Sequence, residues 1–238
     1  MKKIIFILAF TLLFAACNNK KETNESSQEK VVDEHNAENS LDWNGTYKGI
    51  TPCASCEGIF TTIKLNSDMT YEKSYLYLGE KGDTYNENGK FSFLEDKTTI
   101  KLNSKDEASL YRVEEGSLVM LNSEGKEVTD KLAEYYRLQK MSDAEVEFTD
   151  KPIKGYLTID AGIATFNPCG YSKIYSLKYS GKTLNKKYNA IAKKSANKQP
   201  VMAELKVKYL GEAKNYDGLL ELKEIVNLEY LTVDSNCL

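Results

Sequence analysis

The chain has 238 residues, and its formal charge of −3 results from 32 basic and 35 acidic side chains. It contains one histidine, His35, in a stretch predicted to be disordered, which excludes a Ser–His–Asp catalytic set. It also has no glycine-rich loop of the kind that cradles phosphates. We therefore expect no enzymatic activity.

Residues 1–16 are predicted to be a lipoprotein signal peptide. Residues 1–3 are basic, and residues 4–14 are apolar apart from one threonine, a run too short to span a bilayer. The next residues end in Ala-Ala-Cys and resemble the bacterial lipobox, so Cys17 is expected to be acylated and to become the first mature residue. The alternative is an ordinary secretory signal followed by a chance cysteine. We expect no nucleic-acid partner for an exported protein.

Residues 17–42 are predicted to be a lipid anchor followed by a disordered tether. The stretch 18–42 has seven acidic residues, three lysines and few large apolar side chains, so it cannot bury enough surface to fold. Asn18 favours sorting to the outer membrane, on its periplasmic face. An outward-facing anchor stays open, because Phe14 stands where the lipobox prefers leucine and because the tether is acidic.

Residues 52–59 read Pro-Cys-Ala-Ser-Cys-Glu-Gly-Ile and place Cys53 and Cys56 in a turn between two strand-like runs. In an oxidising envelope this pair indicates a local disulfide or a soft-metal site, and two such thiolates can bind Cu(I). Three interpretations stay open: a staple that shapes the hairpin, a metal-binding or redox-sensing site, and a thiol–disulfide catalyst. Catalysis is the least favoured, because catalytic pairs usually begin a helix and strand residues follow here.

Residues 43–140 alternate with period two, which predicts an up-and-down antiparallel barrel of eight short strands. The predicted strands lie near 43–50, 58–66, 69–78, 86–94, 97–103, 108–114, 117–122 and 133–139. Such a barrel can be filled by its own side chains or can hold one small ligand. A small apolar ligand bound in this barrel, as in lipocalins, is the alternative function.

Residues 141–153 are polar and acidic and are predicted to be a linker, followed by a second domain at 154–238. The pattern there predicts three strands, a helix over 181–194 and two more strands, which is compatible with an OB-type barrel. The predicted strands lie near 154–160, 163–167, 172–179, 201–210 and 218–230. Residues 150–238 hold 14 basic and 9 acidic side chains. This excess of positive charge indicates either a solvated lysine-rich face or a surface that contacts anionic lipid headgroups.

Four cysteines remain after Cys17, an even number that suggests two disulfides with three possible pairings. The domain division favours Cys53 with Cys56 and Cys169 with Cys237. The second bridge would close a loop of about 69 residues and contribute about 4 kcal/mol in the loop-entropy model. It would also pin a C-terminal tail that otherwise frays.

The chain resembles the NlpE family of envelope lipoproteins. The resemblance begins at Tyr47-Lys48-Gly49 and includes the whole cysteine segment from Pro52 to Ile59, which is far more specific than two cysteines alone. It extends into the second half through 155–169 and Cys237. Further matching residues are Thr62, Leu65, Asp68, Thr70, Tyr71, Tyr77, Leu78, Gly79, Gly89, Lys90, Phe91, Ala164, Thr165 and Phe166.

The resemblance implies a lipocalin-like N-terminal barrel that carries the CxxC motif at Cys53 and Cys56. It also implies a C-terminal OB-fold domain held by a Cys169–Cys237 disulfide, and an outer-membrane anchor. The implied role is sensory: copper, lipoprotein-trafficking faults, redox faults or surface contact are relayed to the Cpx two-component system through its inner-membrane sensor kinase. The resemblance also implies a link to copper resistance.

Overall fold

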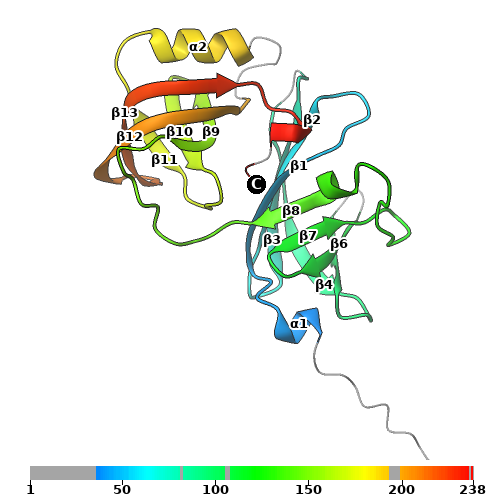
Figure 1. The fold of residues 1–238 in the computed structure, drawn as a ribbon. Coiled ribbons are helices and arrows are strands. Elements are labelled where there is room, and N and C mark those ends of the chain that lie inside the picture. The colour runs from blue at the N-terminus through cyan, green and yellow to red at the C-terminus, as the bar shows by residue number, and fades with distance from the viewer. Residues whose placement is uncertain (1–35, 81–82, 105–107, 193–198, 236, 238) are drawn as a thin grey trace, which may run out of the picture. The chain divides into compact units, whose positions relative to one another are not determined.

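The computed structural model describes residues 36–80, 83–104, 108–192, 199–235 and 237. The predicted signal peptide, Cys17, His35 and most of the tether lie outside the described residues. The described part of the chain is mainly β and forms two closed barrels, as expected (Figure 1). None of its helices is both long and apolar enough to cross a membrane.

The first barrel contains eight antiparallel strands in sequential order, which confirms the predicted up-and-down barrel. Its strands are β1 (Gly45–Thr51), β2 (Gly58–Leu65), β3 (Thr70–Leu78), β4 (Tyr85–Phe93), β5 (Thr99–Leu102), β6 (Ser109–Glu114), β7 (Ser117–Met120) and β8 (Arg137–Lys140). Pairing of Tyr47 with Lys140 joins β1 to β8 and closes the sheet. A closed barrel leaves no sheet edge exposed to other chains.

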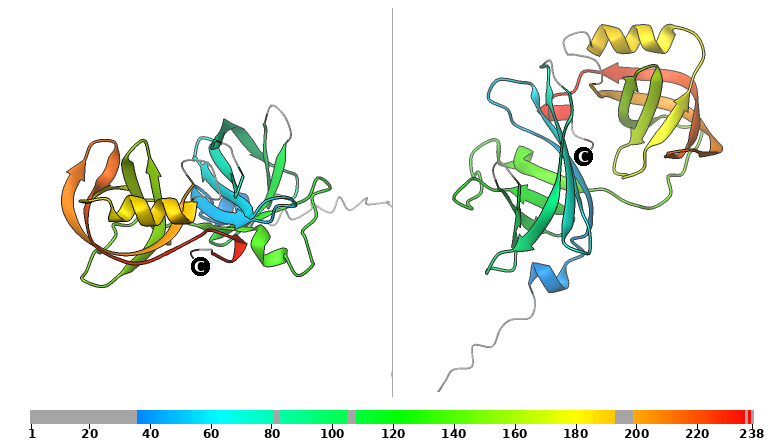
Figure 2. Two further views of the ribbon diagram at one scale, coloured as in Figure 1. Left: turned by 90° about the horizontal axis from the view of Figure 1, so that it is seen from above. Right: turned by 180° about the vertical axis from the view of Figure 1, so that it is seen from behind.

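The interior of the first barrel is filled at one end by apolar and aromatic side chains. This core includes Tyr47, Tyr71, Phe91 and Leu118, all nearly inaccessible to solvent. The short helix α1 (Ala37–Ser40) lies at this end, and the β1–β2 loop lies at the other (Figures 1 and 2). The two ends of the barrel are therefore chemically different.

The predicted tether is too long, because residues 36–42 are folded against the first barrel. Asn36 caps α1 by accepting a hydrogen bond from the backbone of Asn39, and Ala37 is buried in the barrel core. Lys97 forms an ion pair with Glu38 at 2.8 Å. The polar composition of this stretch predicts disorder, yet Ala37 is small and apolar enough to pack into the barrel. Asn36 provides the N-cap for a single helical turn.

The predicted strand near 133–139 is shorter than expected. Residues Ala133–Tyr136 form a 3-10 turn, η1, and strand pairing starts only at Arg137. The turn starts with a hydrogen bond from the backbone of Ala133 to the carbonyl of Asp130. Two adjacent tyrosines favour a strand by propensity, but this local hydrogen bonding prevails.

The second barrel has five strands and one helix in the predicted order. These are β9 (Ile153–Asp160), β10 (Ile163–Pro168), β11 (Tyr175–Lys178), α2 (Thr183–Ala192), β12 (Val201–Ala213) and β13 (Tyr216–Glu229). The strands close in the order β10-β11-β13-β12-β9, with β11 and β13 parallel. This arrangement is consistent with the predicted OB-type barrel.

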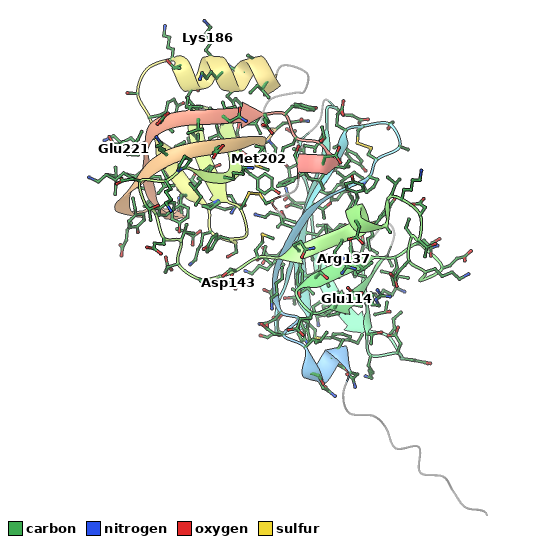
Figure 3. The ribbon with its side chains drawn as sticks, viewed as in Figure 1. Glu114, Arg137, Asp143, Lys186, Met202 and Glu221 are labelled. Carbon is green, nitrogen blue, oxygen red and sulfur yellow. A yellow bond between two sulfur atoms is a disulfide. The ribbon has the colours of Figure 1, made fainter. Side chains whose placement is uncertain are left out.

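The helix α2 contributes its apolar side to the core of the second barrel. Leu184 and Tyr188 are buried among strand residues such as Phe166 and Leu205. Lys186 lies on the opposite side and points away from the barrel (Figure 3). This is the amphipathic pattern expected of a helix that covers one side of a barrel.

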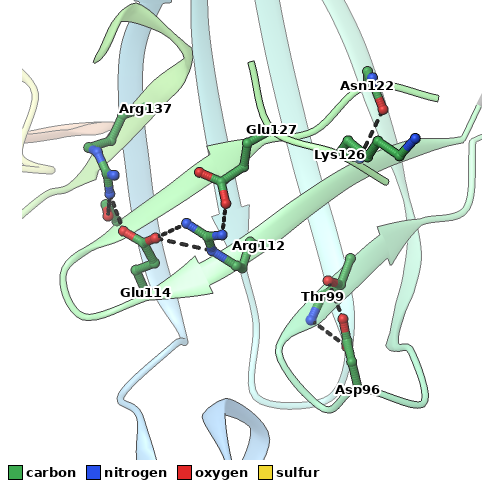
Figure 4. A network of polar contacts seen from close by, with 9 residues as sticks. Asp96, Thr99, Arg112, Glu114, Asn122, Lys126, Glu127 and Arg137 are labelled. Atoms are coloured by element: carbon green, nitrogen blue, oxygen red, sulfur yellow. Dashed lines mark hydrogen bonds and ion pairs between the residues drawn. The ribbon is translucent and has the colours of Figure 1, made fainter. Parts of the chain in front are cut away.

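Charged side chains form a network on the outside of the first barrel (Figure 4). Glu114 accepts hydrogen bonds from Arg112 and Arg137, Arg112 also pairs with Glu127, and Arg137 donates to Ser117 at 2.7 Å. Burial alone would raise the pKa of Glu114. The hydrogen bonds and positive charges of the two arginines outweigh burial and hold that pKa below its ordinary value.

The Glu114 network predicts acid sensitivity of the first barrel. A carboxyl group with a lowered folded-state pKa stabilises the fold above its unfolded pKa, so this stability is lost as the pH falls below about 4.5. Replacing Glu114→Gln should cost about 1 kcal/mol at neutral pH and flatten this acid dependence. Urea unfolding across the acid range measures both effects. Glu124→Gln, which alters an exposed pair with Lys126, is the matched control and should change neither.

Candidate functional site: the CxxC hairpin and its neighbours

The CxxC motif occupies the loop between β1 and β2, as predicted. Cys53 and Cys56 are joined by a disulfide with their Cα atoms 5.3 Å apart. Both cysteines are half-buried, whereas Ala54 and Ser55 between them are exposed. The loop therefore offers its tip to solvent while its disulfide rests against the hairpin.

The glycine that follows the motif fixes how the loop joins β2. Gly58 has a φ of +143°, and a Cβ atom there would lie 2.6 Å from Ile50 Cγ2 and 3.2 Å from Val233 Cγ1. The backbone N–H of Glu57 donates to the carbonyl of Leu78 at 3.1 Å, which extends the pairing of β2 with β3. Only glycine fits this conformation and this close approach, which explains its place in the cysteine segment.

The second predicted pair is also a disulfide in this structure, between Cys169 and Cys237 with Cα atoms 5.0 Å apart. The backbone N–H of Cys169 donates to Lys154 at 2.9 Å, so this cysteine is held at the end of the β9–β10 pairing. Tyr156 lies close to the backbone of Cys237, and burial raises the pKa of Tyr156 to about 12. The bridge thus ties the C-terminal tail to the second barrel.

One apolar cluster connects the CxxC hairpin with this tail, and we name it the junction cluster. Its members come from β1, β2 and β3 of the first barrel, from β9 and β12 of the second, and from the tail after β13. They are Ile50, Leu76, Leu78, Tyr156 and Leu231, all buried, with Phe60, Met202, Val233 and Cys237 packed against them (Figure 3 labels Met202). Phe60 and Tyr156 meet edge to face at 4.8 Å between ring centroids. The Cys169–Cys237 disulfide therefore borders this cluster through Cys237, and the strands on either side of the CxxC loop contribute Ile50 and Phe60 to it.

Buried polar contacts join the same parts of the chain. The side chain of Gln199 is almost fully buried; its amide nitrogen donates to the carbonyls of Tyr77 and Glu80, and its oxygen accepts from the backbone of Gly79. Tyr188 of α2 donates to the carbonyl of Gln199 at 2.5 Å. These bonds fix the start of the β3–β4 loop, beside the CxxC loop.

A buried lysine forms a further contact across the barrels. Lys48 of β1 donates to the side-chain oxygen of Asn167, and burial lowers the pKa of Lys48 to about 8. Asn167 in turn donates to the carbonyls of Tyr171 and Lys173. Burying a charged ammonium group costs free energy unless the group is hydrogen-bonded. Lys48 therefore has to keep its bond to Asn167, and this bond orients β1 against the second barrel.

Sequence reasoning treated the two cysteine pairs as belonging to separate domains and missed the junction cluster. A signal was present. In β3, Tyr75 and Tyr77 face the barrel interior, yet Leu76 and Leu78 on the other face are also apolar and buried. A strand that is apolar on both faces is covered on both faces, so a second packing surface could have been inferred at this end of the barrel.

The chemistry of the CxxC loop is limited by what surrounds it. Among the described residues, no group of three or more histidine, cysteine or acidic side chains gathers to hold a metal ion. The motif leads into β2 rather than into a helix, so it differs from catalytic cysteine pairs, which usually stand at a helix N-terminus. What the pair can offer is a disulfide or, once reduced, two thiolates.

Two sequence comparisons found similarity to known proteins. Residues 47–131 match the NlpE N-terminal domain family, and this matched range includes the CxxC loop. Lipoprotein NlpE of Escherichia coli (strain K12) is 27% identical over 205 residues, covering 84% of this chain and 81% of that protein.

Two solved structures are also similar. One, from Shewanella oneidensis and provisionally named a lipoprotein, is 42% identical over 44% of this chain and 95% of its own, with a TM-score of 0.42. The other, the Cpx pathway activator NlpE from Escherichia coli, is 22% identical over 81% of this chain and 97% of its own, with a TM-score of 0.33. The sequence matches show an NlpE N-terminal domain at residues 47–131 and a similarity to lipoprotein NlpE over most of the chain.

Proposed function

We propose that this protein is a lipid-anchored lipoprotein of the cell envelope that signals envelope stress and contributes to copper tolerance. The observation that carries the proposal is the family match across the CxxC hairpin, together with the exposed tip of that hairpin. An NlpE from Escherichia coli is described as a Cpx pathway activator. By analogy, the partner proposed here is the sensor kinase of a Cpx-like two-component system.

The anchor is proposed at Cys17, in the outer membrane and on its periplasmic face. A single acyl chain holds a protein only weakly, so a stable anchor takes more than one chain. Mass spectrometry of protein from membranes tests this, with an acylated N-terminal Cys17 as the expected result. An unmodified N-terminus, or a chain that still begins at Met1, would remove the anchor.

Copper binding requires reduction of the Cys53–Cys56 disulfide, since thiolate is the ligand form. Two electrons and two protons from a dithiol reductant open the bridge, and the reductant leaves as a disulfide. Binding of Cu(I) then releases the two thiol protons. The two cysteines are close enough for both sulfurs to bind one ion, because they are already bonded to each other here. Soft thiolate ligands select Cu(I) over the harder divalent ions.

Cu(I) titration of the reduced protein tests the metal role. Reduced wild type should bind one Cu(I) at the hairpin in competition with a colorimetric Cu(I) chelator. The Cys53→Ser/Cys56→Ser variant should lose at least tenfold in affinity, since hydroxyl groups are poor ligands for a soft ion. Ser55→Ala, in the same loop, is the matched control and should bind as wild type does. Equal affinity of the double variant and wild type would remove copper from the proposal.

Signalling is tested in the native host with a reporter of envelope stress. Excess wild-type protein should raise the reporter signal, and a Cys17→Ala variant that lacks the anchor should not. If neither excess wild-type protein nor deletion of its gene changes the reporter signal, the signalling role is wrong. Copper binding could still hold in that case, because the two parts of the proposal are measured separately.

A further inference from the structure

The first barrel is not filled along its whole length. A cavity of about 210 Å³ lies in its interior near the CxxC end, where Thr51 and Ile59 form the last pair of the hairpin. The side chains that define its character are Ile59, Lys73, Tyr75, Tyr77 and Met120. The described residues thus pack the barrel tightly at the α1 end and leave room at the opposite end.

A lysine lies inside this cavity. Lys73 of β3 donates to Ser109 Oγ of β6 at 3.1 Å, and because β3 and β6 are not neighbours, its side chain spans the barrel interior. Glu87 forms a long ion pair with Lys73, with 4.0 Å between Oε2 and Nζ, and this distance leaves the ammonium protons free of a hydrogen bond to it; Glu87 also accepts a bond from Tyr71 at 2.5 Å. An ammonium group has three donors. Within the described contacts, Lys73 therefore keeps donors for an anion.

Two tyrosines of the cavity wall, Tyr75 and Tyr77, belong to the same strand as this lysine, and Tyr85 packs on both from outside the cavity lining. Tyr75 and Tyr85 are stacked with ring centroids 5.1 Å apart, and Tyr77 meets both edge to face, at 6.0 and 5.9 Å. The three rings pack on one another, so they leave no space for a cation between them. Lys73 already lies 5.4 Å from the centre of the Tyr75 ring. A cationic ligand would therefore meet a like charge, whereas an anion or a flat ring is favoured.

The volume limits the size of the ligand. At the packing density of protein interiors, about 210 Å³ holds about ten non-hydrogen atoms. A long-chain fatty acid is too large to be enclosed. The lysine and the tyrosines also differ from the wholly apolar lining that an apolar ligand would need. The lipocalin-like alternative is thereby narrowed to a smaller and more polar class of ligand.

We propose that this cavity binds a small aromatic carboxylate, with its carboxylate on Lys73 and its ring against Tyr77, Ile59 and Met120. The site is separate from the CxxC disulfide, although both lie at the same end of the barrel. The proposal stands independently of copper binding and of signalling.

Isothermal titration calorimetry with three matched probes tests the charge preference on the wild-type protein alone. Phenylacetate should bind one per chain and at least tenfold more tightly than 2-phenylethylamine or benzyl alcohol, because a charge-assisted hydrogen bond exceeds a neutral one. The methyl resonance of Met120 should shift on binding in NMR spectra, which places the ligand in the cavity.

Two variants test the role of the lysine. Lys73→Met should remove the preference for phenylacetate over benzyl alcohol while keeping the ring contacts. Lys64→Met, which alters an exposed lysine of β2, is the matched control and should keep the wild-type preference. A thermal melt of each variant shows whether it is folded.

Three results would overturn the proposal. One is the absence of saturable phenylacetate binding, and another is amine binding as tight as that of the acid. The third is displacement of phenylacetate by hexadecanoate bound more tightly and without dependence on Lys73, which would indicate a lipid site instead. The first two results are measured on the wild-type protein, so they test the proposal even if the Lys73→Met variant is misfolded.

Discussion

Replacing both Cys169 and Cys237 with alanine is expected to lower the free energy of unfolding of the second barrel by about 4 kcal/mol. The bridge joins residues 68 apart, and a cross-link of that span removes much of the freedom of the unfolded chain. A loss of this size is a large share of the stability of a small domain. It should appear as an early transition of the second barrel in urea.

The single tryptophan allows the two barrels to be followed separately. Trp43 packs edge to face on Phe91 and Phe93 of the first barrel, so its fluorescence reports on that barrel. In the double-alanine variant, we expect the far-UV circular dichroism to change early and the Trp43 signal to stay near its wild-type midpoint. Alanines at Cys53 and Cys56 are the comparison, since that short loop contributes only about 2 kcal/mol in the same model. Equal shifts of both signals would show that the barrels unfold as one unit.

Shortening Leu231 to alanine should loosen the junction cluster by about 2–5 kcal/mol. Leu231 is fully buried among Ile50, Leu76 and Leu78, so the change leaves a cavity in a place where two barrels meet. The effect should be clearest at the amide of Gly79, whose hydrogen bond runs to Gln199. Hydrogen exchange at that amide should become much faster.

The control for Leu231 is Leu210→Ala, which removes the same atoms from an exposed position on β12. This change should leave exchange at Gly79 as it is in wild type. Unchanged protection of Gly79 in Leu231→Ala would mean that the cluster does not hold the barrels together. The polar contacts of Gln199 and of Lys48 would then carry that role.

Much of the fold follows from local sequence patterns. Alternation in residues such as Ile59, Thr61 and Ile63 predicts β2 because every second side chain enters the barrel. The spacing of Leu184 and Tyr188 predicts α2 because both reach the same core. Where the structure departs from the prediction, as at Ala37 and at Ala133–Tyr136, short-range capping and hydrogen bonds override the average character of the stretch.

The candidate site was less completely predictable. The cysteine positions and pairings follow from spacing and from the domain division. The junction cluster depends on contacts between residues far apart in the chain, such as Phe60 with Tyr156, which no local pattern encodes. The cavity was only an open alternative, because alternation places Lys73 inside the barrel without showing whether neighbouring side chains fill the space beside it.

Strand β1 has a further consequence. From Tyr47 to Thr51 it is buried on both faces, towards the barrel interior and towards the second barrel. An ordinary surface strand has every second position free to vary as sequences diverge. Here five successive residues lack that freedom, so substitutions in this stretch should be tolerated as poorly on one side of the strand as on the other.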